Sequence, residues 1–365
     1  MHKRHRANSD PVRSSIANIQ QQSQKKRQKV SALLEMPVEI LLLIANQLPL
    51  HTRLVLARTC LQLRGIFCHR RLADMREANE PGLDLGQRLD FLACMARDRP
   101  DHWVCQRCEG LHPWQEGDHL ADASSQVSHC KSRSGDRGGY DNAYPHHIYH
   151  LNVQLALKYS RFASEGKRAF GGQDRLNLLM SPLNGLQLKL RGGHETAVLY
   201  FVYPRVVNGR FLVQTELRYA GDIHLDPYNY FTNIITVCNH QDTRSWRTEK
   251  QLRWFGDGGI DSIFETLFKA SKTPTGFEVH GACSYCCTDY SVQRLSGSIV
   301  LRSWQDFGPE ASPTNPTWSA LFSVLGDQTN IEHEPGSVRA LYKSVDQEYK
   351  HLPVTAHGRF RECIM

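Results

Sequence analysis

Two pairs of cysteines have the spacing at which thiolates bind a shared metal ion. Cys105 and Cys108 form one Cys-x2-Cys turn, and Cys283 and Cys286 form another far downstream. Each turn can present two thiolates to the same ion, and two such turns supply the four ligands of a tetrahedral zinc site. The spacing therefore predicts one structural zinc ion, bound by all four thiolates, that clamps distant segments of the chain together.

Neighbouring side chains could replace one of these ligands. The candidates are His112, Cys130, His280 and Cys287. Simple burial of the cysteines and a redox-active pair are the alternative interpretations, although a thioredoxin-like site requires a βαβ context that neither pair has. The eleven cysteines are an odd number, and the polar first 30 residues show no apolar export signal. Metal ligands or reduced thiols are thus favoured over disulfides.

Motifs for enzymatic chemistry are incomplete. A zinc deaminase requires a His-x-Glu element and a proline before its cysteine pair, whereas Val104 and Ala282 precede the pairs here. The glycine-rich turn at 256–259 lacks the Lys-Ser/Thr of a phosphate-binding loop. Neither the ordered ligand series of a RING domain nor an activated thioester cysteine is recognisable. We therefore expect a protein that is not an enzyme.

The elements that would position the cysteines are both helices and strands. Apolar spacing predicts helices at 87–97, 147–159, 261–270 and 337–349. Alternation from Phe211 to Tyr219 predicts a half-buried strand, and further strands are expected at 198–203, 231–238 and 297–304. Asn208-Gly209 is typical of a two-residue hairpin turn. The prediction is an α+β domain with an antiparallel sheet.

A separate helical module is expected before this domain. Pro37, Ile40, Leu41, Ile44, Ala45 and Leu48 follow the spacing of one helical face. Pro37 suits the first turn of a helix and Pro49 its end. A second apolar series, from Leu54 to Phe67, predicts one or two more short helices. So small a module cannot bury all of its aliphatic side chains, so some apolar surface should remain for a partner.

The stretch from Met36 to Ile44 resembles the F-box motif, which usually opens Leu-Pro-x-Glu-Ile, with Met36 in place of the first leucine. The resemblance covers residues 33 to about 75. It implies a small helical module that binds the Skp adaptor of cullin-RING ubiquitin ligases. Under this resemblance the residues at or near the interface would be Pro37, Ile40, Leu41, Ile44, Leu48 and Leu54.

The remainder of the chain resembles a group of fungal F-box proteins. The matching elements are Trp103-x-Cys105-x2-Cys108, then Leu111-His112-Pro113, and a second cysteine-rich turn before Asp289-Tyr290. The resemblance implies the substrate-recognition subunit of an SCF-type ubiquitin ligase, with an unknown protein as its target. The alternatives are an F-box protein that acts outside ubiquitination and a zinc-containing protein that binds nucleic acid.

The charge distribution favours the adaptor over nucleic-acid binding. The net charge is +7, but residues 1–30 hold eight Lys or Arg and one Asp. Removing these from the 44 basic and 37 acidic residues leaves 36 of each, so the body is neutral. The basic run at 25–29 could direct nuclear import. With no apolar run of membrane-spanning length, we expect a cytoplasmic or nuclear protein.

The expected domain organisation has three parts. Residues 1–31 are predicted to form a disordered basic tail, because they are polar and lack apolar periodicity. Residues 32–77 form the F-box helical module. Residues 78–365 form the α+β target-recognition domain, with a mobile loop near 115–145 that is rich in Gly, Ser, Asp and His.

Overall fold

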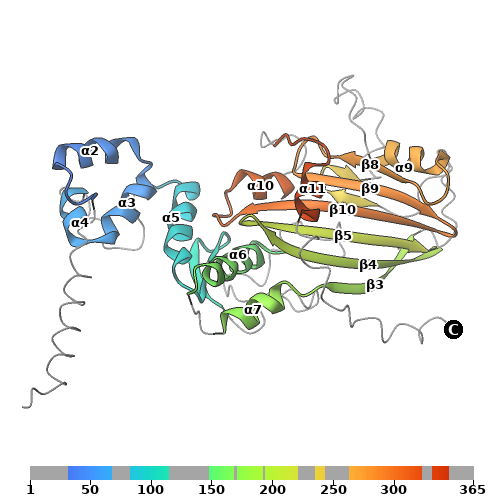
Figure 1. The fold of residues 1–365 in the computed structure, drawn as a ribbon, viewed down its shortest axis with the longest axis horizontal. Helices are drawn as coiled ribbons and strands as arrows, with labels where there is room; N and C mark the ends of the chain where they lie inside the picture. The colour runs from blue at the N-terminus through green and yellow to red at the C-terminus, as the bar shows by residue number, and fades with distance from the viewer. Residues whose placement is uncertain are drawn as a thin grey trace, which may run out of the picture. The chain divides into compact units, whose positions relative to one another are not determined.

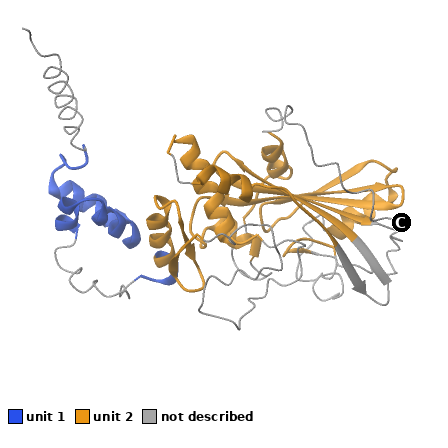
Figure 2. Ribbon diagram, turned by 90° about the horizontal axis from the view of Figure 1, so that it is seen from below, with its two compact units in different colours: residues 1–87 blue, residues 88–365 orange. Residues whose placement is uncertain are grey.

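The computed structural model describes residues 32–67, 83–114, 148–167, 171–191, 194–220, 235–242, 263–322 and 331–344. The predicted tail at 1–31 and the predicted loop near 115–145 lie outside these ranges. The chain divides into two compact units, residues 1–87 and residues 88–365 (Figure 2).

Residues 32–67 of the first unit form three short helices. They are α2 (Val38–Gln47), α3 (Leu50–Thr59) and α4 (Leu61–Phe67). Pro37 lies at the start of α2, where a missing N–H group costs nothing, and Pro49 follows its end, as expected. Pro49 also directly precedes α3, which was not predicted. Within these helices the buried apolar side chains are Leu41, Ala45, Leu54, Ala57 and Leu63.

The second unit is built on a six-stranded antiparallel sheet of order β3-β4-β5-β10-β9-β8 (Figure 1). The strands are β3 (Leu183–Arg191), β4 (His194–Val207), β5 (Arg210–Ala220), β8 (Glu278–Ala282), β9 (Thr288–Leu295) and β10 (Ser298–Pro309). The predicted hairpin turn is confirmed, since Asn208 (φ 50°) and Gly209 (φ 70°) join β4 to β5.

Helices pack on both faces of this sheet. On one face, α6 (His150–Ser164) shares an apolar cluster with Phe211 and Val213, and α9 (Ile263–Lys272) shares another with Leu217 and Tyr219. On the other face, α11 (Ser337–Lys343) packs against Leu212. Odd and even residues of β5 thus face opposite layers, as the alternation predicted. The prediction of a half-buried strand was wrong, because Leu212 is as fully buried as Phe211 and Val213. The remaining described helices are α5 (Leu85–Arg97), α7 (Gly172–Leu179) and α10 (Pro316–Phe322).

Two small hairpins complete the described part of the second unit. One pairs β1 (His102–Cys105) with β2 (Gly110–Pro113), and the other pairs β6 (Thr236–Cys238) with β7 (Gln241–Asp242). The architecture is therefore mixed α+β with an antiparallel sheet, as expected. Among the described helices, none has the length and apolar character needed to cross a membrane.

Candidate metal centre

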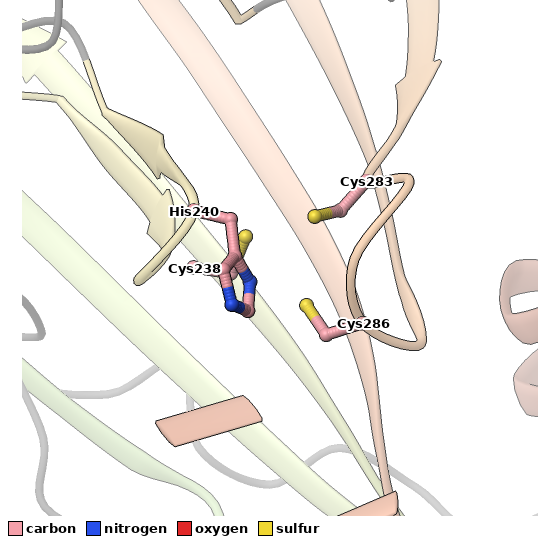
Figure 3. A group of neighbouring side chains, drawn as sticks. All are labelled: Cys238, His240, Cys283 and Cys286. Carbon is pink, nitrogen blue, oxygen red and sulfur yellow. The ribbon is translucent and has the colours of Figure 1, made fainter. Parts of the chain in front are cut away.

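Four buried side chains converge beside the six-stranded sheet. Cys238, His240, Cys283 and Cys286 each offer one donor atom, and these atoms all lie within 4.8 Å of one another (Figure 3). Two ligands come from the β6–β7 hairpin and two from the turn between β8 and β9. Such a group, drawn from two separate segments, could hold one metal ion.

Hydrogen bonds from neighbouring elements fix the hairpin that carries Cys238 and His240. The Gln305 side chain on β10 donates through Nε2 to the carbonyl oxygen of Val237 at 3.3 Å. The Gln241 Oε1 atom accepts a 3.0 Å bond from the backbone N–H of Ile263, the first residue of α9. The β6–β7 hairpin is thus attached to the sheet at one end and to a helix at the other.

The turn between β8 and β9 is closed by its own backbone. Cys283 N donates to Thr288 O at 2.8 Å, and Thr288 N donates to Cys286 O at 2.7 Å. Tyr285 N points at Cys283 Sγ, 3.4 Å away, and the Thr288 hydroxyl lies 3.2 Å from Cys286 Sγ. N–H and O–H groups directed at sulfur stabilise thiolates, which are the form of cysteine that binds metals.

The three thiols are close enough to shift one another's pKa. The hydrogen bond with Cys238 is the main reason that the pKa of Cys283 is far below its ordinary value. Burial raises the pKa of Cys238 well above the ordinary value. A bound cation would favour the ionised form of all three thiols, because cysteine binds metals as the thiolate.

The donor set suits a d¹⁰ cation such as zinc. Tetrahedral coordination by three sulfurs and one imidazole nitrogen would separate the donors by about 3.6 to 3.8 Å. That separation is compatible with donor atoms that all lie within 4.8 Å of one another. All four residues are buried, so a bound ion would have its four positions filled by protein.

The expectation of one site shared by both cysteine pairs needs correction. Cys105 and Cys108 lie instead with His112 in a second group, in which Cys108 Sγ and His112 Nε2 are 2.8 Å apart. Only Cys283 and Cys286 of the predicted set belong to the buried centre. Their remaining partners come from β6–β7, because this hairpin packs beside the β8–β9 turn.

The other proposed ligands are placed elsewhere. His112 does join Cys105 and Cys108, as a possible replacement ligand. Cys287 packs with Trp304 in a separate apolar cluster, and the His280 ring lies 2.7 Å from Arg339 Nη1. Cys130 lies outside the described residues. Cys238 and His240 were missed, and the signal that could have found them is their Cys-x-His spacing.

The residues implied for partner binding divide into two sets. Leu41 and Leu54 are buried in the core of the first unit, with exposed fractions of 1% and 8%. Pro37, Ile40 and Ile44 are exposed, and Leu48 is half-buried. Leu41 and Leu54 therefore support the fold of the module, and contact with a partner would fall to its exposed neighbours.

Comparison of the chain with protein-family models, with curated proteins and with solved structures gave no match. The function must accordingly be argued from the residues and their geometry.

Proposed function

We propose that the protein is an F-box adaptor, the substrate-recognition subunit of an SCF-type ubiquitin ligase, and that its first unit binds the Skp adaptor. The observation that carries this proposal is the exposed apolar surface of α2. Five aliphatic residues of that helix are substantially exposed: Val38 (48%), Ile40 (42%), Leu42 (41%), Leu43 (61%) and Ile44 (36%).

This surface is larger than the fold of the first unit requires. One face of α2, with Leu41 and Ala45, fills the small core, while aliphatic side chains on its other faces meet solvent. On α4, Leu61 is 79% exposed. Apolar residues gathered in this way mark interaction sites, since burying them against a partner is favourable. The resemblance of residues 33 to about 75 to the F-box supplies the identity of that partner.

The second unit is proposed to recognise the target protein. In our proposal a structural zinc ion, bound by Cys238, His240, Cys283 and Cys286, ties the β6–β7 hairpin to the β8–β9 turn. Four protein ligands leave no coordination position for water or substrate, so this ion would have a structural and not a hydrolytic role. Ubiquitin transfer would then be the work of the partners, and this chain would contribute proximity of the target.

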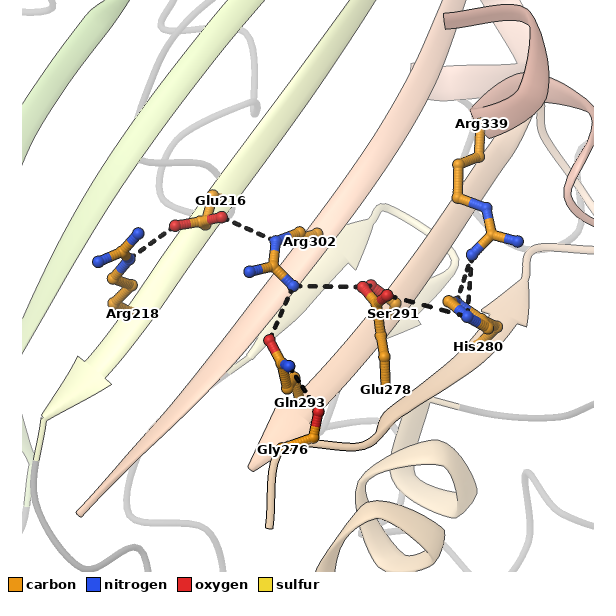
Figure 4. Close-up of polar contacts among 9 residues, drawn as sticks. All are labelled: Glu216, Arg218, Gly276, Glu278, His280, Ser291, Gln293, Arg302 and Arg339. Atoms are coloured by element: carbon orange, nitrogen blue, oxygen red, sulfur yellow. Dashed lines mark hydrogen bonds and ion pairs between the residues drawn. The ribbon is translucent and has the colours of Figure 1, made fainter. Parts of the chain in front are cut away.

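The charges on the open part of the sheet are compensated, which weighs against nucleic-acid binding. Arg302 on β10 bonds Glu216 at 2.8 Å and Glu278 at 3.2 Å (Figure 4). Glu216 also accepts a 2.6 Å bond from Arg218. A surface that grips phosphates needs positive charge in excess, whereas these arginines alternate with carboxylates across the strands. Equal numbers of basic and acidic residues outside residues 1–30 also weigh against nucleic-acid binding.

Co-purification of the tagged full chain distinguishes the candidate functions. An SCF subunit should recover both Skp and a cullin. An F-box protein that acts outside ubiquitination should recover Skp alone, and a nucleic-acid-binding protein should recover RNA or DNA. A matched chain with Leu43→Asp on the exposed face of α2 should lose Skp and cullin together. Recovery of neither Skp nor a cullin with the unaltered chain would refute the proposal.

A further inference from the structure

We propose that the β1–β2 hairpin binds a second zinc ion through Cys105, Cys108 and His112. The inference depends neither on the adaptor function nor on the buried centre, because it concerns a different group of side chains. Cys105 and Cys108 would thus bind an exchangeable zinc ion of their own, in place of the predicted structural ion shared with Cys283 and Cys286.

The register of the hairpin brings the three donors together. Cys105 pairs with Gly110, and Trp103 pairs with His112. Residues opposite one another, or two apart along a strand, share a face of a hairpin, so Cys105 and His112 lie on the same side. Cys108 sits in the connecting turn, and its sulfur lies over Gly110, where an added Cβ would be 3.4 Å from Sγ.

The conformation of the turn is held in place independently of any metal. Glu109 adopts a left-handed conformation (φ 52°), which is unfavourable for a residue with a side chain. Its carboxylate accepts a 2.7 Å bond from Arg88 on α5, outside the hairpin. This ion pair secures the strained residue directly after Cys108 and so helps to keep that thiol facing the strands.

The imidazole and the strand behind it are also fixed. The His112 ring stacks on Trp103, with centroids 5.0 Å apart and an interplanar angle of 27°. The Gln154 side chain on α6 makes two 3.0 Å hydrogen bonds to the backbone of Val104, one to N–H and one to C=O. The Lys158 ammonium, also on α6, donates to the carbonyl oxygen of His102. The ligands thus project from a hairpin anchored along its first strand.

The spacing of the donors requires only a small adjustment to accept zinc. Cys108 Sγ and His112 Nε2 are 2.8 Å apart, and a tetrahedral ion would spread a sulfur and a nitrogen to about 3.6 Å. Cys108 is exposed, so a shift of this size at its side chain disturbs no core packing. The donor set of two thiolates and one imidazole matches that of zinc sites with three protein ligands.

The two sites should differ in how readily they release zinc. Four buried residues form the centre of Cys238, whereas the hairpin group, as far as the chain is described, consists of three donors, one of them on the exposed residue Cys108. A ligand on an exposed residue gives chelators a direct route to the ion. Mild chelation should therefore remove the hairpin zinc while the buried ion stays until the unit unfolds.

Counting zinc per chain tests the inference. Full-length protein is dialysed against excess zinc chloride, freed of unbound metal and analysed by native mass spectrometry. We expect about two ions in the wild type and in the control Cys94→Ser, which alters an exposed cysteine of α5 outside both groups. The double variant Cys108→Ser/His112→Asn should carry one ion fewer than the wild type. An unchanged zinc count in this variant would overturn the proposal.

Two further measurements distinguish the absence of the hairpin site from the absence of the buried centre and from unfolding of a variant. Cys238→Ser removes a ligand of the buried centre, so an unchanged count in that variant would refute the centre and leave the hairpin site standing. Because a ligand substitution can also unfold a protein, the wild type is examined as well, with zinc release to a chelator followed beside circular dichroism. Release of one ion before any loss of structure is expected. Release of all the zinc in a single step with unfolding would contradict an exchangeable hairpin site.

Discussion

Replacing Cys238 by serine should lower the free energy of unfolding of the second unit by about 4 kcal/mol. A zinc ion at the buried centre would join β6 to the turn after β8 and so close a loop of roughly 45 residues. In the loop-entropy description of a cross-link, closing a loop of this length restricts the unfolded chain by about 4 kcal/mol at 25 °C. Serine is a poor zinc ligand, so the variant should lose the metal and this restriction with it.

Thermal unfolding of the full chain, followed by circular dichroism at a fixed free zinc concentration, measures this loss. For a domain of this size about 4 kcal/mol corresponds to a decrease in Tm of roughly 8 to 16 °C. Addition of a strong chelator should lower the Tm of the wild type toward that of Cys238→Ser. It should lower the Tm of the variant much less, since only the hairpin zinc remains to be removed.

Cys287→Ser is the matched control, because Cys287 follows Cys286 directly but lies outside the metal group. It is buried beside Trp304, and burial raises the pKa of its thiol to about 11, so the substitution exchanges one neutral side chain for another. We expect a cost of about 1 kcal/mol. If Cys238→Ser and Cys287→Ser unfold at the same temperature, and the chelator leaves the wild type unaffected, the reasoning about the centre is refuted.

Three further predictions concern stability. Leu41→Ala should lower the free energy of unfolding of the first unit by about 2 to 5 kcal/mol, because Leu41 is 1% exposed. Leu43→Ala should change it by no more than about 0.5 kcal/mol, because Leu43 is 61% exposed. Chemical denaturation, followed through the helices of the first unit, should distinguish the two variants. Burial lowers the pKa of His150 from 6.5 to about 3, so the unfolded chain binds a proton there between these pH values while the folded protein does not. The free energy of unfolding should therefore be unaffected by this residue above pH 6.5 and should fall by about 1.4 kcal/mol per pH unit as the pH is lowered toward 3. In His150→Gln, the free energy of unfolding should depend less on pH over that range. The Asp289 carboxylate accepts backbone hydrogen bonds at the start of α11 and lies 3.1 Å from the His333 ring. Asp289→Asn should therefore lower the free energy of unfolding by about 1 to 3 kcal/mol. A denaturation midpoint equal to that of the wild type would contradict a stabilising role for this carboxylate.

The sequence predicted the regular elements well where the signal was local. Alternation from Phe211 to Tyr219 lies within β5, and the Asn208-Gly209 turn lies where positive φ angles are needed. The face of α2 was harder to assign. This helix carries aliphatic side chains on all of its faces. Periodicity therefore assigned Ile40 and Leu41 to the same face, although Leu41 is buried and Ile40 is exposed. Only packing against α4 decides which side becomes core.

The candidate site was predicted in part, for a similar reason. Spacing identified both cysteine pairs, because two thiolates three residues apart can meet in one turn. It could not say which distant segment would supply the remaining ligands. That depends on how β6–β7 packs against the β8–β9 turn, a tertiary contact supported by the bonds of Gln305 and Gln241. The Cys-x-His spacing of Cys238 and His240 becomes meaningful only with this contact.

The most direct test of the adaptor proposal is calorimetric titration of purified Skp adaptor into the full chain. The wild type should bind with a Kd of about 1 μM or tighter. In Ile40→Asp/Leu43→Asp, two charges replace exposed aliphatic residues of α2 and would be buried at the contact, so affinity should fall by more than about a hundredfold while the helical content stays unchanged. Absence of binding by the wild type, or equal affinity of the two proteins, would contradict the account.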